Sequence, residues 1–202
     1  METFFNPHAE KQEHIINAAL NVFGRNGYKK ASIADIAEQA GIAKGMINYY
    51  FGSKKNLYLY LAELTGKLLI EEMDRKFDES VTDFFDNMKM MTNIKIAMIK
   101  EHPAIFSFLT SLYYENDGEV KGDIEKFLAD SMKVRERLLF TGIDVSKFKD
   151  DINPKLLDKL LVWAAEGLTN NFGKDMNVDE IETVVKELYD CLDIMKKYFY
   201  KD

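Results

Sequence analysis

The chain has 202 residues, of which 47% are hydrophobic and 30% are charged, a composition typical of a folded protein and not of a disordered one. Three prolines and 11 glycines exclude collagen-like and proline-rich classes, and the single cysteine, Cys191, excludes an intramolecular disulfide framework and a zinc site built from several cysteines. No run of 18 apolar residues predicts a membrane span, and the first residues lack the pattern of a secretory signal. We therefore expect a cytoplasmic protein.

The formal net charge of −7 argues at first against a nucleic-acid partner, but the charge is unevenly distributed. Residues 1–60 carry seven Lys and Arg residues and five acidic ones, a net charge of +2, and the remainder of the chain carries −9. An acidic body with a mildly basic N-terminal quarter suits a protein that contacts an anionic polymer with one end only.

The apolar periodicity is helical throughout and predicts an all-α fold of about nine helices, with short helices in the first 52 residues and long ones afterwards. The breakers between the helices are glycine and proline clusters. They lie at Gly24 and Gly27, Gly41, Gly52–Ser53, His102–Pro103, Asn116–Gly118, Gly142–Pro154 and Gly173–Asn177. We expect the acidic run from Glu115 to Glu119 to be a solvated turn and not a calcium-binding loop.

Residues 32–51 predict two short helices joined by a tight turn. Ser32 is a good N-cap, and the apolar residues that follow it share one helical face up to Ala40. Gly41 suits a turn with positive φ, and a second helix follows from Lys44 to Tyr50 with Ile47 on its inner side. This order is that of a helix-turn-helix, whose second helix enters the major groove of DNA.

Three sequence elements in the right order carry a resemblance to the TetR family of bacterial transcriptional regulators. They are Ala19, Phe23, Gly27 and Tyr28 at the end of the first helix, the core from Ile36 to Gly45, and the exit from Tyr49 to Leu57. The resemblance covers residues 12–60 as a motif and the rest of the chain as an all-helical architecture. It implies a DNA-binding domain over residues 1–52 and an effector-binding and dimerisation domain over residues 53–202.

The resemblance also implies which residues contact DNA. Ser32 and Lys54 would meet phosphates at the starts of two helices, Lys44, Gly45, Met46 and Asn48 would face the bases, and Tyr49 and Tyr50 would flank the phosphate backbone. Lys29, Lys30 and Lys55 would add diffuse attraction, and the alternative for Lys29 and Lys30 is that they are simply solvated charges.

Asn48 departs from the family pattern, which usually has tyrosine at this position. An asparagine can pair in bidentate fashion with adenine, so Asn48 either reads a base or is solvated or bonded to a phosphate. Tyr49 likewise either contacts DNA or packs against the helix junction.

The helices expected at 153–172 and 178–200 carry apolar stripes that are wide for the outside of a single subunit. The resemblance assigns these helices to a four-helix dimer interface, so the partner is a second copy of the chain. The interface candidates are Leu157, Leu161, Leu168, Ile181, Val184, Leu188, Leu192 and Met195. We expect Cys191, beside this stripe, to be a small buried hydrophobe and not a redox sensor.

The helices expected at 80–101 and 103–115 are rich in methionine and aromatic residues. Such side chains form either an ordinary core or, as the resemblance suggests, an adaptable effector pocket. The pocket candidates are Phe84, Met88, Met91, Phe106, Tyr113, Trp163 and Glu166. Glu166 is either a ligand contact, which would favour a cationic or hydrogen-bonding effector, or a solvated surface group.

The three histidines are scattered and no triad, phosphate loop or metal cluster is evident, so we expect no enzymatic activity, no cofactor and no metal. The sequence predicts a homodimeric regulator of transcription, most simply a repressor that a small-molecule effector releases from a pseudo-palindromic operator. The helix from Ser53 to about Lys76 would transmit the effector's signal. The alternative is a small-molecule or protein binding module with a vestigial DNA-binding head.

Overall fold

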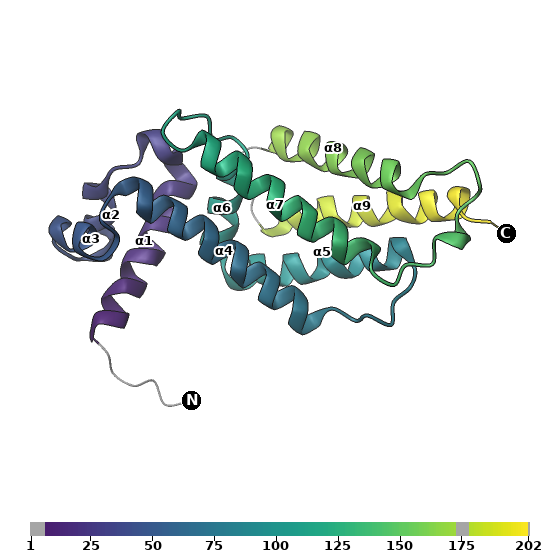
Figure 1. The fold of residues 1–202 in the computed structure, drawn as a ribbon, viewed down its shortest axis with the longest axis horizontal. Helices are drawn as coiled ribbons and strands as arrows, with labels where there is room; N and C mark the ends of the chain where they lie inside the picture. Colours follow the sequence, from purple (N-terminus) through teal and green to yellow (C-terminus); the bar gives the residue numbers. More distant parts are fainter. Residues whose placement is uncertain (1–6, 173–177, 202) are drawn as a thin grey trace. The chain divides into compact units, whose positions relative to one another are not determined.

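The computed structural model describes residues 7–172 and 178–201, with side chains described for residues 11–165, 167 and 180–201. Within these residues the chain forms nine α-helices, one short 3-10 turn and no β-strand, which confirms the predicted all-α fold (Figure 1). None of the helices in the described part of the chain is long and apolar enough to cross a membrane.

The chain divides into two compact units. Unit 1 consists of Met1–Asp74 and Ala97–Val134, and unit 2 consists of Arg75–Ile96 and Arg135–Asp202. The functional division predicted at residue 52 remains a prediction, because the compact units are defined by packing alone.

Unit 1 holds the N-terminal helices together with a helix from the middle of the chain. Its elements are α1 (Pro7–Lys30), α2 (Ile33–Ala40), α3 (Lys44–Phe51), α4 (Lys54–Lys76, up to residue 74), the last turn of α5 (Phe84–Glu101), α6 (Pro103–Leu112) and α7 (Lys121–Phe140, up to residue 134). The break after α5 is the predicted one, with Pro103 in the first turn of α6, where its missing N–H has no consequence.

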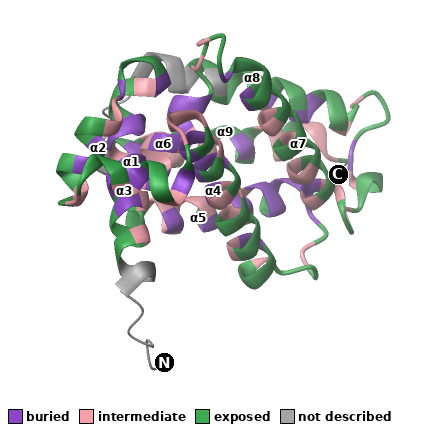
Figure 2. Cartoon of the chain, turned by 60° about the vertical axis from the view of Figure 1, so that its left-hand side comes forward, coloured by how far each residue is buried: buried purple, intermediate pink, exposed green. Residues whose placement is uncertain are grey.

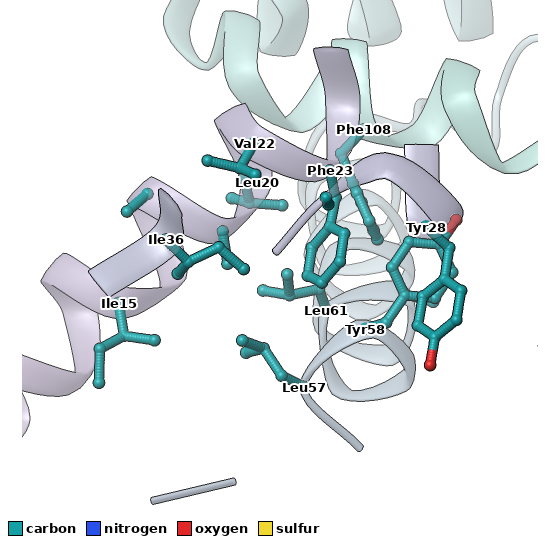
Figure 3. Packing of buried hydrophobic residues seen from close by; sticks show 14 of the residues in the cluster. Ile15, Leu20, Val22, Phe23, Tyr28, Ile36, Leu57, Tyr58, Leu61 and Phe108 are labelled. Carbon is teal, nitrogen blue, oxygen red and sulfur yellow. The ribbon is translucent and has the colours of Figure 1, made fainter. Parts of the chain in front are cut away.

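Aromatic side chains from α1, α4 and α6 form the centre of unit 1 (Figure 3). The ring of Tyr58 lies edge-on to that of Phe23, with 4.8 Å between centroids, and to that of Phe108, with 5.4 Å. All three side chains are fully buried. Edge-to-face pairs of this kind add to the stabilisation from apolar burial, so α6 is firmly tied to α1 and α4.

Gly24 lets α1 and α6 approach closely. A Cβ atom at this position would lie 2.7 Å from Oγ of Ser107 and 3.0 Å from the backbone N of Phe108. The sequence pattern marked Gly24 and Gly27 as the end of the first helix, and only Gly27 breaks it, with φ 69° and ψ 175°. Gly24 is therefore a packing residue inside the helix.

Unit 2 holds most of α5, the end of α7, the 3-10 turn Val145–Lys147, α8 (Pro154–Phe172) and α9 (Val178–Phe199). An aromatic cluster lies at the start of α5, where the ring of Phe84 is within 5.3–5.7 Å of Phe85, Phe140 and Phe148. The backbone N–H of Phe84 donates to the hydroxyl of Tyr200, 3.2 Å away, so the C-terminal end of the chain is part of this core.

Candidate nucleic-acid interface

The turn between α2 and α3 has the geometry that the sequence predicts. The backbone N–H of Asp35 donates to Oγ of Ser32 over 3.1 Å, so Ser32 caps the start of α2. Gly41 ends α2 in the left-handed conformation, with φ 66° and ψ 32°, which glycine adopts without a steric penalty. The next N–H, that of Ile42, donates to the carbonyl of Ala37, so local chemistry fixes the angle between the two helices.

Helix α3 buries one face and exposes the other. Ile47 and Phe51 are buried against the core of unit 1. The opposite face consists of Lys44, Gly45, Asn48 and Tyr49, which are exposed, with Met46 half-buried beside them. The predicted base-facing residues thus share one surface, and Tyr49, at 73% exposure, does not pack into the helix junction.

Gly45 has no packing role in the folded chain, because a Cβ atom at this position would meet nothing within 4 Å. Glycine weakens a helix interior relative to alanine by about 1 kcal/mol. The absence of a side chain in the first turn of α3 leaves this part of the exposed face open to close approach.

The predicted phosphate contact Lys54 begins α4 and is held in place by an aromatic ring. Its Nζ lies 4.3 Å from the centroid of the Tyr28 ring, a distance at which the ring attracts a cation. Lys29 and Lys30 are exposed at the end of α1. Lys55 pairs with Asp123 at 2.8 Å, so its charge is partly neutralised within the unit.

Tyr50 is half-buried, with its ring edge-on to that of Tyr49 at a centroid distance of 5.2 Å. It also packs against the core cluster of unit 1. The two tyrosines differ in their surroundings, since Tyr49 projects into solvent and Tyr50 is supported by the core.

Glu115 differs from the prediction of a solvated turn, because its carboxylate is bonded to residues of α1 and α4. Oε2 accepts from the backbone N–H of Tyr28 at 2.8 Å and from the hydroxyl of Tyr58 at 3.4 Å. Oε1 accepts from the backbone N–H groups of Asn116 and Asp117. Burial, together with the Glu115 charge, raises the pKa of the Tyr58 hydroxyl, which keeps it a neutral donor.

The effector-pocket candidates fall in both units. Phe84, Met88 and Met91 are buried on α5 in unit 2, and Trp163 is 60% exposed on α8 of the same unit. Phe106 is half-buried and Tyr113 is 55% exposed, and both lie in unit 1. The side chain of Glu166 lies outside the described residues.

The dimer-interface candidates are mostly turned inward. Four of them are buried within the chain itself, three are half-buried, and the side chain of Leu168 lies outside the described residues. The buried four are Leu157, Leu161, Ile181 and Leu192, and the half-buried three are Val184, Leu188 and Met195.

The exposed apolar side chains of α8 and α9 are instead their helical neighbours. Figure 2 shows exposed positions, in green, along much of α8. We call this set the outer stripe, and each of its large members is more than half exposed. It comprises Leu156, Leu160 and Trp163 on α8, and Ile194 and Tyr198 on α9. Cys191, expected to be buried, is exposed and precedes Ile194 by three residues on α9.

A compact helical unit with an exposed recognition helix and basic residues at the adjoining helix ends defines a helix-turn-helix regulator of transcription. The family model described as bacterial regulatory proteins, tetR family, matches residues 15–61, from α1 to α4. The HTH-type transcriptional regulator YvdT of Bacillus subtilis, whose function is uncharacterized, is 42% identical over 185 residues, which are 90% of this chain and 93% of that protein. The chain therefore belongs to the TetR family.

One further relative and two solved structures are also similar to this chain. The fatty acid metabolism regulator protein of B. subtilis is 25% identical over 159 residues, 75% of this chain and 77% of that one. Among solved structures, a TetR family regulator from Chloroflexus aurantiacus has a TM-score of 0.72 at 24% identity and covers 100% of this chain and 99% of its own. The regulator FadR of B. subtilis, solved with stearoyl-CoA, has a TM-score of 0.61 at 17% identity over 88% of this chain and 97% of its own.

Proposed function

We propose that this regulator is a homodimeric repressor that binds a pseudo-palindromic operator through α3 and is released by a small molecule. The observation that carries the proposal is the exposed face of α3, where Lys44, Gly45 and Asn48 stand beside one another on a helix that follows a tight Gly41 turn. A surface of short and hydrogen-bonding side chains can approach base edges in the major groove.

The phosphate contacts of the proposal are those expected from the sequence. The N-terminal helices α1 to α3, which we call the head, would be fixed on the duplex by contacts to phosphates. These contacts come from Ser32 at the start of α2, Lys54 at the start of α4, and Tyr49 and Tyr50 at the end of α3. The bases would be faced by Lys44, Gly45, Met46 and Asn48. Lys54 is supported by its position over the Tyr28 ring, which limits the freedom of a long side chain before DNA binds.

The proposal assigns dimerisation to the outer stripe of α8 and α9. Leu156, Leu160 and Trp163 recur at spacings of four and three residues, so they share one face of α8. A face of large exposed apolar side chains is stabilised when a second copy covers it. A two-fold dimer would place two α3 helices about one DNA turn, roughly 34–36 Å, apart.

Release by an effector is a shift between two conformations, one of which spaces the two heads correctly for DNA. Its support is that α6 packs on α1 within unit 1, so a change at α6 reaches the head directly. The fatty acid metabolism regulator and the stearoyl-CoA complex among the relatives make amphipathic small molecules the first effectors to test. A regulator of bacterial genes acts on the chromosome, so the proposal includes a cytoplasmic location.

The test is binding of the purified protein to the intergenic DNA beside its own gene, measured by gel shift over a range of salt concentrations. We expect a complex of two chains per site that is selective for an inverted repeat and weakens steeply with salt, since phosphate contacts release counterions. A protein that binds small molecules but shows no preference for any of these fragments would be a binding module with a vestigial head, and would contradict the proposal.

A further inference from the structure

The carboxylate of Glu115 supplies a hydrogen-bond acceptor that α1 itself does not offer to Tyr28. Gly27 breaks α1 with φ 69° and ψ 175°, so the N–H of the next residue no longer points along the helix to the carbonyls of the preceding turn. Tyr28 is only 2% exposed, and a buried N–H needs an acceptor. Oε2 of Glu115 takes this role at 2.8 Å, so Glu115 fixes the backbone of Tyr28.

The ring of Tyr28 is fixed as well, and it lies under a proposed DNA contact. Its centroid is 5.0 Å from that of Tyr58 and 6.3 Å from that of Phe23, two fully buried rings. On its other side, Nζ of the half-buried Lys54 lies 4.3 Å from the Tyr28 centroid. A ring attracts a cation only at short range and over its face, so the position of Tyr28 determines where the Lys54 ammonium lies.

We propose that Glu115 is a positioning residue for DNA binding, because it holds Tyr28 and the ring of Tyr28 places the ammonium of Lys54 for its phosphate contact. This inference rests on the proposed function, in which Lys54 contacts a phosphate. A long side chain that is held in place beforehand loses less conformational freedom on binding. Glu115 therefore strengthens DNA binding, although its own negative charge repels phosphates.

Asp123, in the first turn of α7, provides a matched control. Its Oδ2 pairs with Nζ of Lys55 at 2.8 Å, and Lys55 adjoins Lys54 at the start of α4. Removing either acid, Glu115 or Asp123, takes one negative charge from unit 1, and electrostatics alone would then favour an anionic polymer. The positioning role of Glu115 predicts the opposite sign, a loss of affinity.

The experiment measures binding of the full-length protein to a duplex that carries the inverted repeat beside its own gene. Fluorescence anisotropy gives the affinity over a range of salt concentrations, at a temperature where circular dichroism shows each variant folded. The variants are Glu115→Ala, Glu115→Gln, Lys54→Met, the double variant of Glu115→Ala with Lys54→Met, and Asp123→Ala as the control. Glu115→Gln keeps an oxygen that can accept from Tyr28.

A second measurement needs no DNA. The NMR signal of the methylene group beside Nζ of Lys54 reports whether this group lies over an aromatic ring, because the ring current shifts it. We expect the shifted signal in the wild type and in Glu115→Gln, and a signal closer to that of a solvated lysine in Glu115→Ala.

We expect Glu115→Ala to bind the duplex about five- to tenfold more weakly than the wild type, with a salt dependence reduced by up to about one contact per chain. In the Lys54→Met background, the same change should alter the affinity by less than about twofold, since there is no ammonium left to position. Glu115→Gln should bind within about threefold of the wild type, and Asp123→Ala at least as tightly as the wild type.

The proposal is overturned if Glu115→Ala binds as tightly as the wild type, or if its loss of affinity is equally large in the Lys54→Met background. A wild-type Lys54 signal at the position of a solvated lysine overturns it too, and this result does not depend on the folding of the alanine variant. A wild type that prefers none of the DNA fragments contradicts the proposed function, and the inference fails with it. Selective binding that is indifferent to Glu115 contradicts the inference alone.

Discussion

The backbone N–H of Tyr28 donates a hydrogen bond to Oε2 of Glu115 over 2.8 Å, joining residues that are 87 positions apart in the sequence. Tyr28 lies at the end of α1, beneath Lys54, and Glu115 begins the turn between α6 and α7. One carboxylate thus ties the helix end that supports a proposed phosphate contact to the turn that follows α6.

Removing this carboxylate is expected to destabilise the protein. Glu115→Ala leaves the N–H of Tyr28 and the hydroxyl of Tyr58 without their acceptor, and bonds to a charged group contribute about 1.5–3 kcal/mol. We expect the free energy of unfolding in urea to fall by about 2 kcal/mol. The control is Glu125→Ala, whose exposed partner Lys121 lies 3.8 Å away, and which should change the stability by less than about 0.5 kcal/mol. Equal losses for the two variants would show that Glu115 does not tie the turn to the head.

The role of Asn48 is decided by the pattern of its effects on different DNA sequences. If Asn48 reads an adenine, Asn48→Ala should cost about 1–3 kcal/mol on the operator and much less on a variant changed at the contacted base pair. Binding to a panel of operator variants, measured by fluorescence anisotropy, gives this pattern. A uniform loss over the whole panel would assign Asn48 to the backbone instead.

The outer stripe is expected to hold two copies of the chain together. Leu160→Glu places a charge in the middle of the stripe, and we expect a mass near 23.4 kDa by light scattering where the wild type shows twice that value. Because Leu160 is exposed in the single chain, each protomer should stay folded. Lys159→Glu, next to it on α8, should remain dimeric, and a dimeric Leu160→Glu variant would place the interface elsewhere.

The stability of the protein should depend on pH through Lys95. Its pKa of about 8 lies below the ordinary value of 10.5, so folding disfavours the charged form. The cost is complete below about pH 8 and disappears as the pH approaches 10.5, and its full size is about 3 kcal/mol at about 1.4 kcal/mol per pKa unit. The advantage of Lys95→Met over the wild type should therefore be larger at pH 7 than at pH 10 in urea titrations. An advantage that is independent of pH would indicate a well-solvated ammonium.

The local features of the head could be predicted from the sequence because their causes are local. The cap at Ser32, the left-handed Gly41 and the inward face of Ile47 each depend on neighbours within a few residues. The resemblance to a family supplies the expected DNA-contacting roles of the outward residues, which chemistry alone leaves open and which stay predictions.

The features that could not be predicted depend on distant partners or on helix rotation. In α8 the pairs Leu156–Leu160 and Leu157–Leu161 have the same composition and spacing, and only packing decides that the first pair is exposed and the second buried. In the sequence, Glu115 is one of several acidic residues in a predicted turn, and its bond to Tyr28 could not be predicted because Tyr28 lies 87 residues away.

The most direct test of the account is the effect of Gly45→Glu on DNA binding. Gly45 lies on the exposed face of α3 with open space around it, so a side chain there leaves the fold intact but meets the DNA with bulk and negative charge. We expect the melting temperature to stay within about 2 °C of the wild type, and the affinity for the operator to fall by more than about tenfold, or about 1.4 kcal/mol. A folded variant that binds the operator as tightly as the wild type would contradict the claim that this face of α3 reads DNA.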